Sequence, residues 1–383
     1  MRNGQRAFTV LLSIIIVAPL LSGCALRAQG REVEQLLIVQ AMGLDRTAGG
    51  VCVSLASGAD QAATGTPVRL QGSGSSVTQA LARIRAGTSK EELFCSHVGH
   101  LVIGEAAAQQ GLAPLMDYVC RSGDIRLSVP VYVLRGETAS SAVLGVGDDS
   151  HGLGDALDAV DNELRQRGDG RVTDAAALLR QLGDCGSALV CALSLSPSAE
   201  TGQTEGAPEP PRTVTASGYG VLKDERLIGW LDRGQAVAAD LLTGDSGICE
   251  LDVTDQAGLS VTLFLTGGHT SFLPHWDKNG GLAALELLVE VRSLLAEDTT
   301  GGTEPYYLQQ ALERSISERV REVLQLSRQW GCDFLGLESK LRLQEPQRFQ
   351  ALTPAFSERW PSLPLTISVK ATFSGTGDVE GGQ

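Results

Sequence analysis

Residues 36–57 read LLIVQAMGLDRTAGGVCVSLAS, two apolar runs with a short polar segment between them. Apolar runs of this length, bounded by Asp and Gly, are typical of β-strands. We therefore expect strands at 36–44 and 51–57, joined by a turn at 45–50. Because the chain that follows continues to alternate strand-like and helix-like segments, these two strands begin a mixed α+β fold.

The strand and helix patterns continue to about residue 195 and define an expected N-terminal α+β domain, residues 31–195. Val77, Leu81 and Ile84 recur at helical spacing, whereas residues 58–76 are polar and rich in Gly and Thr and predict a loop. The remaining segments follow the same two patterns. We expect helices at 77–86, 105–120, 155–165 and 173–182, and strands at 98–103, 126–134 and 188–195.

A Pro-rich stretch interrupts this pattern. Residues 196–212 read SPSAETGQTEGAPEPPR, with four prolines and no apolar periodicity, which indicates a linker. A long surface loop inside one domain is the alternative. The segment after it, 213–270, is expected to form a small middle domain with a hairpin (strands 215–222 and 226–231), a helix at 235–242 and a strand at 260–265.

The last part of the chain predicts a second mixed unit, the C-terminal α+β domain at 271–375. Apolar residues alternate at 285–291 and again at 365–373, as half-buried strands require. Between them, a stripe with helical spacing predicts an amphipathic helix of about 20 residues. The stripe consists of Leu308, Leu312, Ile316, Val320, Val323 and Leu324. The Gly-rich segment 376–383 is expected to be a disordered tail.

The first residues have the features of a lipoprotein leader. Arg2 and Arg6 precede an apolar run from Phe8 to Leu20, and Leu-Ser-Gly then leads to Cys24. The apolar run is shorter than the roughly 20 residues that a bilayer-spanning helix needs, and fits a secretory signal with a lipobox. We expect cleavage after residue 23, lipidation of Cys24 and a tether at 24–30. An ordinary signal peptide or a signal anchor is the alternative.

The charge balance excludes several classes of partner. Of 383 residues, 45 are acidic and 31 are Lys or Arg, giving a net charge of −14. Loss of residues 1–23 removes two Arg and no acid, which brings the mature charge to −16. Nucleic acids and anionic lipid surfaces need basic protein surface. The sequence therefore predicts membrane attachment by lipid and not by charge.

The sequence carries no known catalytic motif, so we expect no enzymatic site, no cofactor and no metal. The nearest approach to a metal motif is Cys95-x-His97-x-x-His100, but zinc sites need a fourth ligand or water, and His100 lies in an apolar run. His269 and His275 are expected in a connecting loop. The acidic residues from Asp148 to Asp161 lack the spacing of a calcium loop and predict a solvated helix face. The seven cysteines after Cys24 are expected to be buried thiols, although a disulfide stays possible.

Five sequence blocks, in order, resemble those of the Ger(x)C spore germination lipoproteins. The first, 31–45, has the family's R-E-x-E opening and a strand that ends in A-x-G-x-D. Leu335, Leu337, Glu338 and Phe349 depart from residues common in the family, which leaves the packing of that corner in question. The four other blocks are FCSH together with LVIGE (94–97 and 101–105), RSGDIRL (121–127), GVLKDERLIGWL (220–231) and GCDFLG (331–336).

This resemblance implies the C subunit of a nutrient germinant receptor. Such subunits have three consecutive α+β domains behind a lipoprotein signal peptide, lie on the outer face of the inner spore membrane and act beside two membrane-embedded subunits, of A and B type. The implied role is non-catalytic, in receptor assembly or signalling. A solute-binding lipoprotein of a transporter is the alternative, and would show two similar lobes around a cleft. A lipid-anchored hydrolase would need a nucleophile and base that the sequence does not present.

Overall fold

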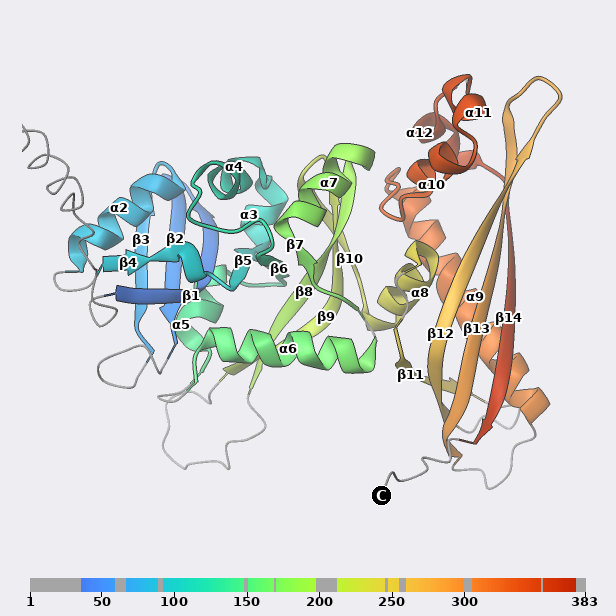
Figure 1. The fold of residues 1–383 in the computed structure, drawn as a ribbon, viewed down its shortest axis with the longest axis horizontal. Coiled ribbons are helices and arrows are strands. Elements are labelled where there is room, and N and C mark those ends of the chain that lie inside the picture. The colour runs from blue at the N-terminus through green and yellow to red at the C-terminus, as the bar shows by residue number, and fades with distance from the viewer. Residues whose placement is uncertain are drawn as a thin grey trace, which may run out of the picture.

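The computed structural model contains two β-sheets with helices packed against both, which confirms the expected α+β class (Figure 1). Cys24, the expected signal peptide and tether, and residues 377–383 of the expected tail lie outside the described residues. The structure describes residues 36–58, 67–88, 92–147, 151–168, 170–197, 212–244, 247–254, 260–298, 305–352 and 354–376.

The larger sheet has a parallel centre and antiparallel edges. Its main strands follow the order β10-β9-β8-β6-β5-β1-β2-β3, and β1, β5, β6 and β8 are mutually parallel. Parallel strands are covered on both faces, and β5 is buried at every residue. The strands are β1 (Leu36–Thr47), β2 (Gly50–Ser57), β3 (Arg69–Gly74), β4 (Glu92–Phe94), β5 (His100–Gly104), β6 (Pro130–Leu134), β7 (Thr173–Asp174), β8 (Ser187–Pro197), β9 (Arg212–Lys223) and β10 (Arg226–Leu231).

Helices cover both faces of this sheet, and each face has its own apolar core. One core includes side chains of α2 (Val77–Gly87), α3 (Glu105–Gln110), α4 (Ala113–Arg121) and α7 (Ala175–Cys185). The other includes side chains of α5 (Ala139–Gly145) and α6 (Leu153–Arg167). Figure 1 shows α6 running along the lower face while α2, α4 and α7 lie above.

The smaller sheet has the order β11-β12-β13-β14, antiparallel except for the parallel pair β13–β14. Two helices, α8 and α9, pack their apolar residues against it in a third core, and the predicted stripe of α9 is buried there. The elements are α8 (Arg233–Thr243), β11 (Cys249–Thr254), β12 (Ser260–Trp276), β13 (Leu282–Asp298), α9 (Pro305–Gln329), α10 (Leu337–Gln344), α11 (Pro346–Gln350), α12 (Phe356–Arg359) and β14 (Leu365–Thr376).

Several local predictions are wrong, each for an identifiable reason. The expected helix at 105–120 is two helices, because Gly111 adopts a φ of 120° that breaks the helical path. The expected loop at 58–76 contains β3, a polar edge strand without apolar alternation. His269 and His275 lie in the 17-residue strand β12 and not in a loop. The short elements α5, β11 and α10–α12 were not predicted.

The strands run across two of the expected domain boundaries. Strands β8 and β9, on either side of the expected linker 196–212, pair antiparallel from Ser187 to Pro197, so that segment connects neighbouring strands of one sheet. The expected boundary after residue 270 falls inside β12. Residues 213–270 thus contribute strands to both sheets. Strands β9 and β10 belong to the larger sheet, and β11 and the first part of β12 belong to the smaller one. The surface-loop alternative fits this pairing, and the division into three folding units stays a prediction.

Candidate functional site

Two residues of the sequence blocks, Asp45 and Gly104, form one buried contact at the end of β1 and β5. The Asp45 carboxylate accepts N–H groups of Ala139 and Ser140 at 2.8 and 2.9 Å, in the first turn of α5. A Cβ atom on Gly104 would overlap an Asp45 oxygen. Burial raises the pKa of Asp45, while the two N–H groups lower it. These residues fix a helix to the sheet, a structural role.

The charged turn between β9 and β10 contacts the N-terminal helices. Asp224 and Glu225 have φ of 48° and 63°, the left-handed values that a two-residue hairpin turn requires. The Asp224 N–H donates to the Gly186 carbonyl at 2.8 Å, and the Leu112 N–H donates to the Glu225 carbonyl at 2.9 Å. The predicted hairpin is therefore confirmed, and its turn is fixed to the ends of α4 and α7.

The same hairpin holds the C-terminal end of α9, which belongs to the smaller sheet. Lys223 Nζ donates to the Trp330 carbonyl at 3.0 Å. A Cβ on Gly229 would lie 2.5 Å from the Trp330 ring, so the ring packs directly on the glycine backbone. Cys332 Sγ lies 3.8 Å from the Leu222 carbonyl. Two sequence blocks about a hundred residues apart thus meet where the two sheets join, a region that we call the junction.

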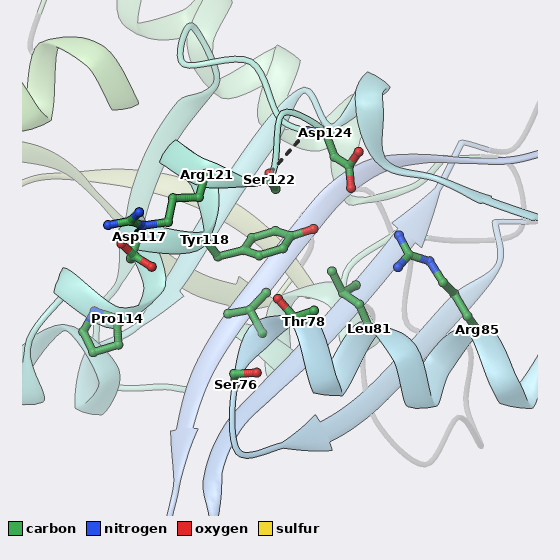
Figure 2. Close-up of a pocket in the computed structure, with 11 residues that line it drawn as sticks. Ser76, Thr78, Leu81, Arg85, Pro114, Asp117, Tyr118, Arg121, Ser122 and Asp124 are labelled. Atoms are coloured by element: carbon green, nitrogen blue, oxygen red, sulfur yellow. Dashed lines mark hydrogen bonds and ion pairs between the residues drawn. The ribbon is translucent and has the colours of Figure 1, made fainter.

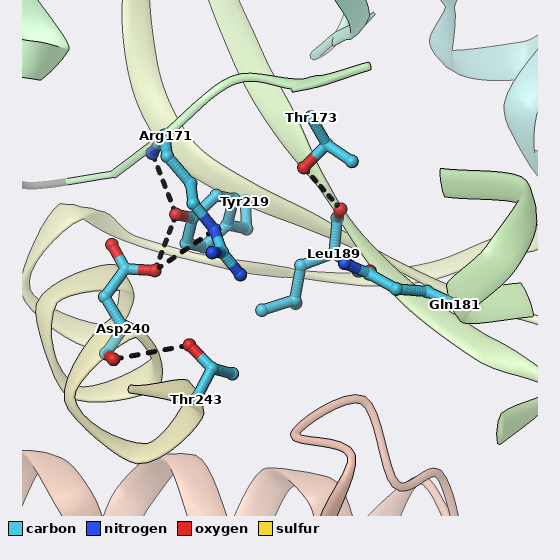
Figure 3. Close-up of polar contacts among 7 residues, drawn as sticks. All are labelled: Arg171, Thr173, Gln181, Leu189, Tyr219, Asp240 and Thr243. Carbon is cyan, nitrogen blue, oxygen red and sulfur yellow. Dashed lines mark hydrogen bonds and ion pairs between the residues drawn. The ribbon is translucent and has the colours of Figure 1, made fainter. Parts of the chain in front are cut away.

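Two buried polar side chains, Tyr219 and Asp240, lie at the junction beside the half-buried Arg171 (Figure 3). The Tyr219 hydroxyl of β9 donates to Asp240 Oδ1 of α8 at 2.8 Å and accepts the backbone N–H of Arg171 at 2.8 Å. Arg171 Nε lies 4.0 Å from the same Asp240 oxygen. Burial raises the pKa of Tyr219 well above its ordinary value, and the Asp240 charge adds to this. The three residues connect β9, α8 and the segment that contains Arg171. The buried Asp240 carboxylate is stable there because donors from the other two segments reach it.

Sequence reasoning did not single out this triad. Asp240 is an acidic residue inside the apolar run 236–242, AVAADLL, which forms most of α8. An acid in a fully apolar run indicates a buried, partnered carboxylate, since an unpaired one is costly. That signal was available for Asp240, whereas its partners Tyr219 and Arg171 come from distant segments and need the fold to identify them.

A third carboxylate, that of Asp333, caps α10 beside a cavity of about 240 Å³. It accepts the N–H groups of Leu337 and Glu338 at 3.0 and 2.7 Å. Burial raises its pKa to about 7, against the lowering effect of these donors. Across the cavity, Cys185 Sγ of α7 lies 3.1 Å from Ser339 Oγ of α10. The cavity therefore lies between α7, beside the larger sheet, and α10, which follows α9.

A separate surface pocket of about 370 Å³ lies between α2 and α4 (Figure 2). Its rim carries charges of both signs. Arg85 lies on α2, and on α4 the Arg121 Nε donates to the Asp117 carboxylate at 2.6 Å. Tyr118 lies between them, and burial raises its pKa to about 12. Because these charges largely neutralise one another, the pocket has no strong preference for an ion.

The structure separates the residues of the Cys95-x-His97-x-x-His100 motif. Cys95 is buried and His97 is exposed. His100 is buried in β5, with Tyr132 Oη at 3.3 Å and Asp158 Oδ1 at 3.2 Å from its two ring nitrogens. Burial lowers the pKa of His100, opposed by Asp158. Within the described ranges, no group of three or more His, Cys, Asp or Glu side chains could hold a metal ion.

The acidic residues near α6 have separate local roles. Asp155 accepts the Gly152 N–H at 2.8 Å and caps the helix. Asp158 contacts His100, and Asp161 pairs with Arg165 at 2.5 Å. Asp148 and Asp149 lie outside the described residues. The expectation of a helix face is confirmed for the residues within α6.

The seven described cysteines form no disulfide with one another. Five are buried, Cys185 is half-buried and Cys120 is exposed, so the expectation of buried thiols holds for most of them. Within the described part of the chain, no helix is both long and apolar enough to cross a membrane.

Taken together, the fold and the junction define a two-sheet α+β protein whose polar clusters connect segments. Comparison with known families identifies the chain. Residues 29–144 match the spore germination protein N-terminal domain, and residues 217–377 match the spore germination B3/GerAC-like C-terminal domain. The chain belongs to the Ger(x)C family of spore germination proteins. This confirms the family that the sequence blocks indicated.

A solved structure has the same fold. It is described as the crystal structure of the GerBC protein and superposes with a TM-score of 0.53 at 14% sequence identity. The match covers 87% of this chain and 96% of that one. No curated protein matches the chain. At this identity the structural match supports the fold, and the two domain matches support the family.

Proposed function

We propose that this protein is the lipid-anchored C subunit of a nutrient germinant receptor and acts without catalysis in receptor assembly or signalling. The observation that carries the proposal is the match of both germination domains, in order, over residues 29–144 and 217–377. The proposed partners are two membrane-embedded subunits, of A and B type, at the outer face of the inner spore membrane.

The geometry of the described clusters supports a scaffold role. Asp45, Asp333 and the Tyr219–Asp240 pair each bind backbone or side-chain donors that join two elements. None of the three pairs a nucleophile with a base, as covalent catalysis requires. Direct contacts between the elements of the two sheets allow a subunit to transmit a change from one partner to another.

Lipidation of Cys24 supplies the proposed attachment. Two acyl chains give stable anchoring at about 0.8 kcal/mol per buried CH₂, whereas one chain binds reversibly. The mature charge of −16 works against attraction to anionic lipid. The solute-binding alternative is not favoured by the family assignment, and no observation of the structure supports it.

The Cys24→Ala variant tests the anchor. We expect loss of palmitate labelling, release of the protein from spore membranes and a strongly impaired response to nutrients, with normal germination by agents that bypass receptors. Cys120→Ala is the matched control, because Cys120 is an exposed thiol outside the lipobox. A normal nutrient response from an unlipidated, soluble protein would refute the anchored-subunit proposal.

A further inference from the structure

Strand β14 forms the outer edge of the smaller sheet (Figure 1). The Pro364 carbonyl accepts the Leu285 N–H of β13 at 2.9 Å, whereas the Ala371 N–H, of opposite parity, donates to Glu313 of α9 at 3.0 Å. Successive backbone groups of a strand point to opposite sides. Leu365 and Ile367, which share the parity of Ala371, therefore direct their backbone N–H and C=O groups away from β13.

A groove of about 570 Å³ lies along this edge, between β14 and the second half of α9. The strand contributes Leu365 and Ile367, both half-buried, and the helix contributes Leu324 between two arginines, Arg321 and Arg328. The arginines are seven residues apart, two helical turns, so they lie on one face of α9. The groove thus combines outward backbone groups, an apolar floor and two positive charges.

Arg328 is incompletely satisfied. Its Nη2 donates to the Leu363 carbonyl, and its guanidinium lies 5.4 Å from the centre of the Trp360 ring. Its Nε is buried without a hydrogen-bond partner. Among the described residues, no carboxylate lies within ion-pair distance of its guanidinium, and burial lowers its pKa. One side of this guanidinium is thus desolvated without a counter-ion while the rest faces the groove, and this arrangement favours an incoming anion.

We propose that this groove binds an extended, acidic segment of a partner protein, which adds a strand to the edge of β14. The partner's backbone would pair with the outward groups of Leu365 and Ile367, an apolar side chain would lie on Leu324, and a carboxylate would pair with Arg328 and Arg321. Strand addition supplies affinity through the backbone and specificity through the side chains. Carboxylate binding to arginine is strong because it is charge-assisted and bidentate. The inference does not depend on lipidation or on receptor membership.

Binding of model peptides to the full-length chain in detergent, measured by fluorescence anisotropy, tests the proposal. The probe is a nine-residue peptide of alternating Thr and Val with a central Glu, and its partner peptide has Gln in that place. We expect the Glu peptide to bind the wild-type chain about tenfold more tightly, since a charge-assisted hydrogen bond contributes that much. Equal affinity for the two peptides would overturn the proposal.

Three variants separate the parts of the site. Arg321→Gln is expected to weaken only the Glu peptide, and Arg328→Gln to abolish the preference for Glu. Ile367→Pro removes one outward N–H without removing a bond to β13, and is expected to weaken both peptides by about tenfold. Arg314→Gln, on the exposed side of α9, is the control and is expected to bind as wild type. Unchanged binding in Arg321→Gln and Ile367→Pro would overturn the proposal even if Arg328→Gln misfolds.

Two other occupants are distinguished by the same assay. Soluble dihexanoylphosphatidylglycerol is added as a competitor, and we expect it to displace the peptide weakly. If the lipid displaces the labelled peptide at a lower concentration than the unlabelled Glu peptide does, the groove binds an anionic lipid and not a protein segment, and the proposal is overturned. A chain that ends at Thr376 is expected to bind as the full chain does. Much tighter binding by that shortened chain would show that residues 377–383 occupy the groove and would contradict the partner assignment.

Discussion

At the scale of single residues, the buried acids of this protein hold elements together. Asp45 caps α5, Asp240 binds Tyr219 and Asp333 caps α10, each at 2.7–3.0 Å from its donors. Buried carboxylates are stable only with such donors. Their positions explain why acids occur in otherwise apolar segments of a chain that has no evident catalytic motif.

The raised pKa of Asp333 gives a pH prediction. The folded protein keeps this proton up to about pH 7, while the unfolded chain loses it near the ordinary value of 3.8. Between those values the unfolded state binds fewer protons, so the contribution of Asp333 to the free energy of unfolding falls as pH rises and levels off above 7. Urea denaturation between pH 4.5 and 8 should show this fall in wild type and not in Asp333→Asn.

The quantity to compare is the change in the free energy of unfolding with pH, and not its absolute value, because Asn at position 333 also loses one acceptor for the α10 N–H groups. Asp174→Asn is the control, since Asp174 caps α7 through one N–H at 2.7 Å. The same slope in wild type and Asp333→Asn would show that Asp333 is ionised in the folded state throughout this range.

The contact of Gly229 with Trp330 gives a packing prediction. Because a Cβ at Gly229 would lie 2.5 Å from the ring, Gly229→Ala must displace Trp330 and should destabilise the protein by about 1–3 kcal/mol. Gly145→Ala is the control, since a Cβ there meets no atom within 4 Å. Chemical denaturation followed by Trp fluorescence measures both. Equal stability of the two variants would mean that the junction is loosely packed.

At the scale of elements, helix α9 and the strands around it determine the second half of the fold. The buried stripe of α9 packs on the smaller sheet, and its C-terminal end is held by the β9–β10 hairpin. Helix α9 therefore contacts elements of both sheets. We expect its core residues to contribute more to stability than those of any short helix.

Truncation of that stripe tests the role of α9. Ile316 is fully buried, and Ile316→Ala should destabilise the protein by about 2–5 kcal/mol through lost burial and the resulting cavity. Glu318→Ala, two residues further on an exposed face, should change stability by about 0.5 kcal/mol or less. Thermal denaturation compares the two. Similar effects of both substitutions would contradict the packing of α9 described here.

Periodicity predicted the elements that a single local signal determines. The stripe of α9, the strands at 36–44 and 51–57, and the charged hairpin turn all follow from neighbours along the chain. Elements fixed by distant partners could not be predicted in this way. Strand β3 is polar and exists because β2 offers its edge, and the pairing of β8 with β9 places the expected linker inside one sheet. Sequence order alone does not reveal such pairings.

The candidate site shows the same division. The lipidation residue Cys24 follows from a local motif, and it stays a prediction because it lies outside the described residues. The sequence blocks correctly indicated the family, but their physical meaning came from the fold: Asp45 meets Gly104, and Gly229 meets Trp330. Tyr219, Arg171 and Arg328 act through partners far along the chain, and no spacing rule identifies them.

At the scale of the whole molecule, the charge, the family and the junction describe one kind of protein. This acidic chain of the Ger(x)C family has two sheets joined through buried polar contacts. Its proposed position at a membrane depends on lipid, because its charge opposes attraction to anionic bilayers. We propose that the protein acts at this membrane as one subunit of a germinant receptor.

Affinity purification from detergent-solubilised inner spore membranes tests that claim most directly. The chain carries a C-terminal tag, and mass spectrometry quantifies the proteins recovered with it against an untagged strain. The account predicts that both membrane-embedded germinant receptor subunits, of A and B type, are recovered in amounts comparable to the chain itself. Recovery of the intact chain with neither subunit, or with a permease and its ATPase instead, would contradict it.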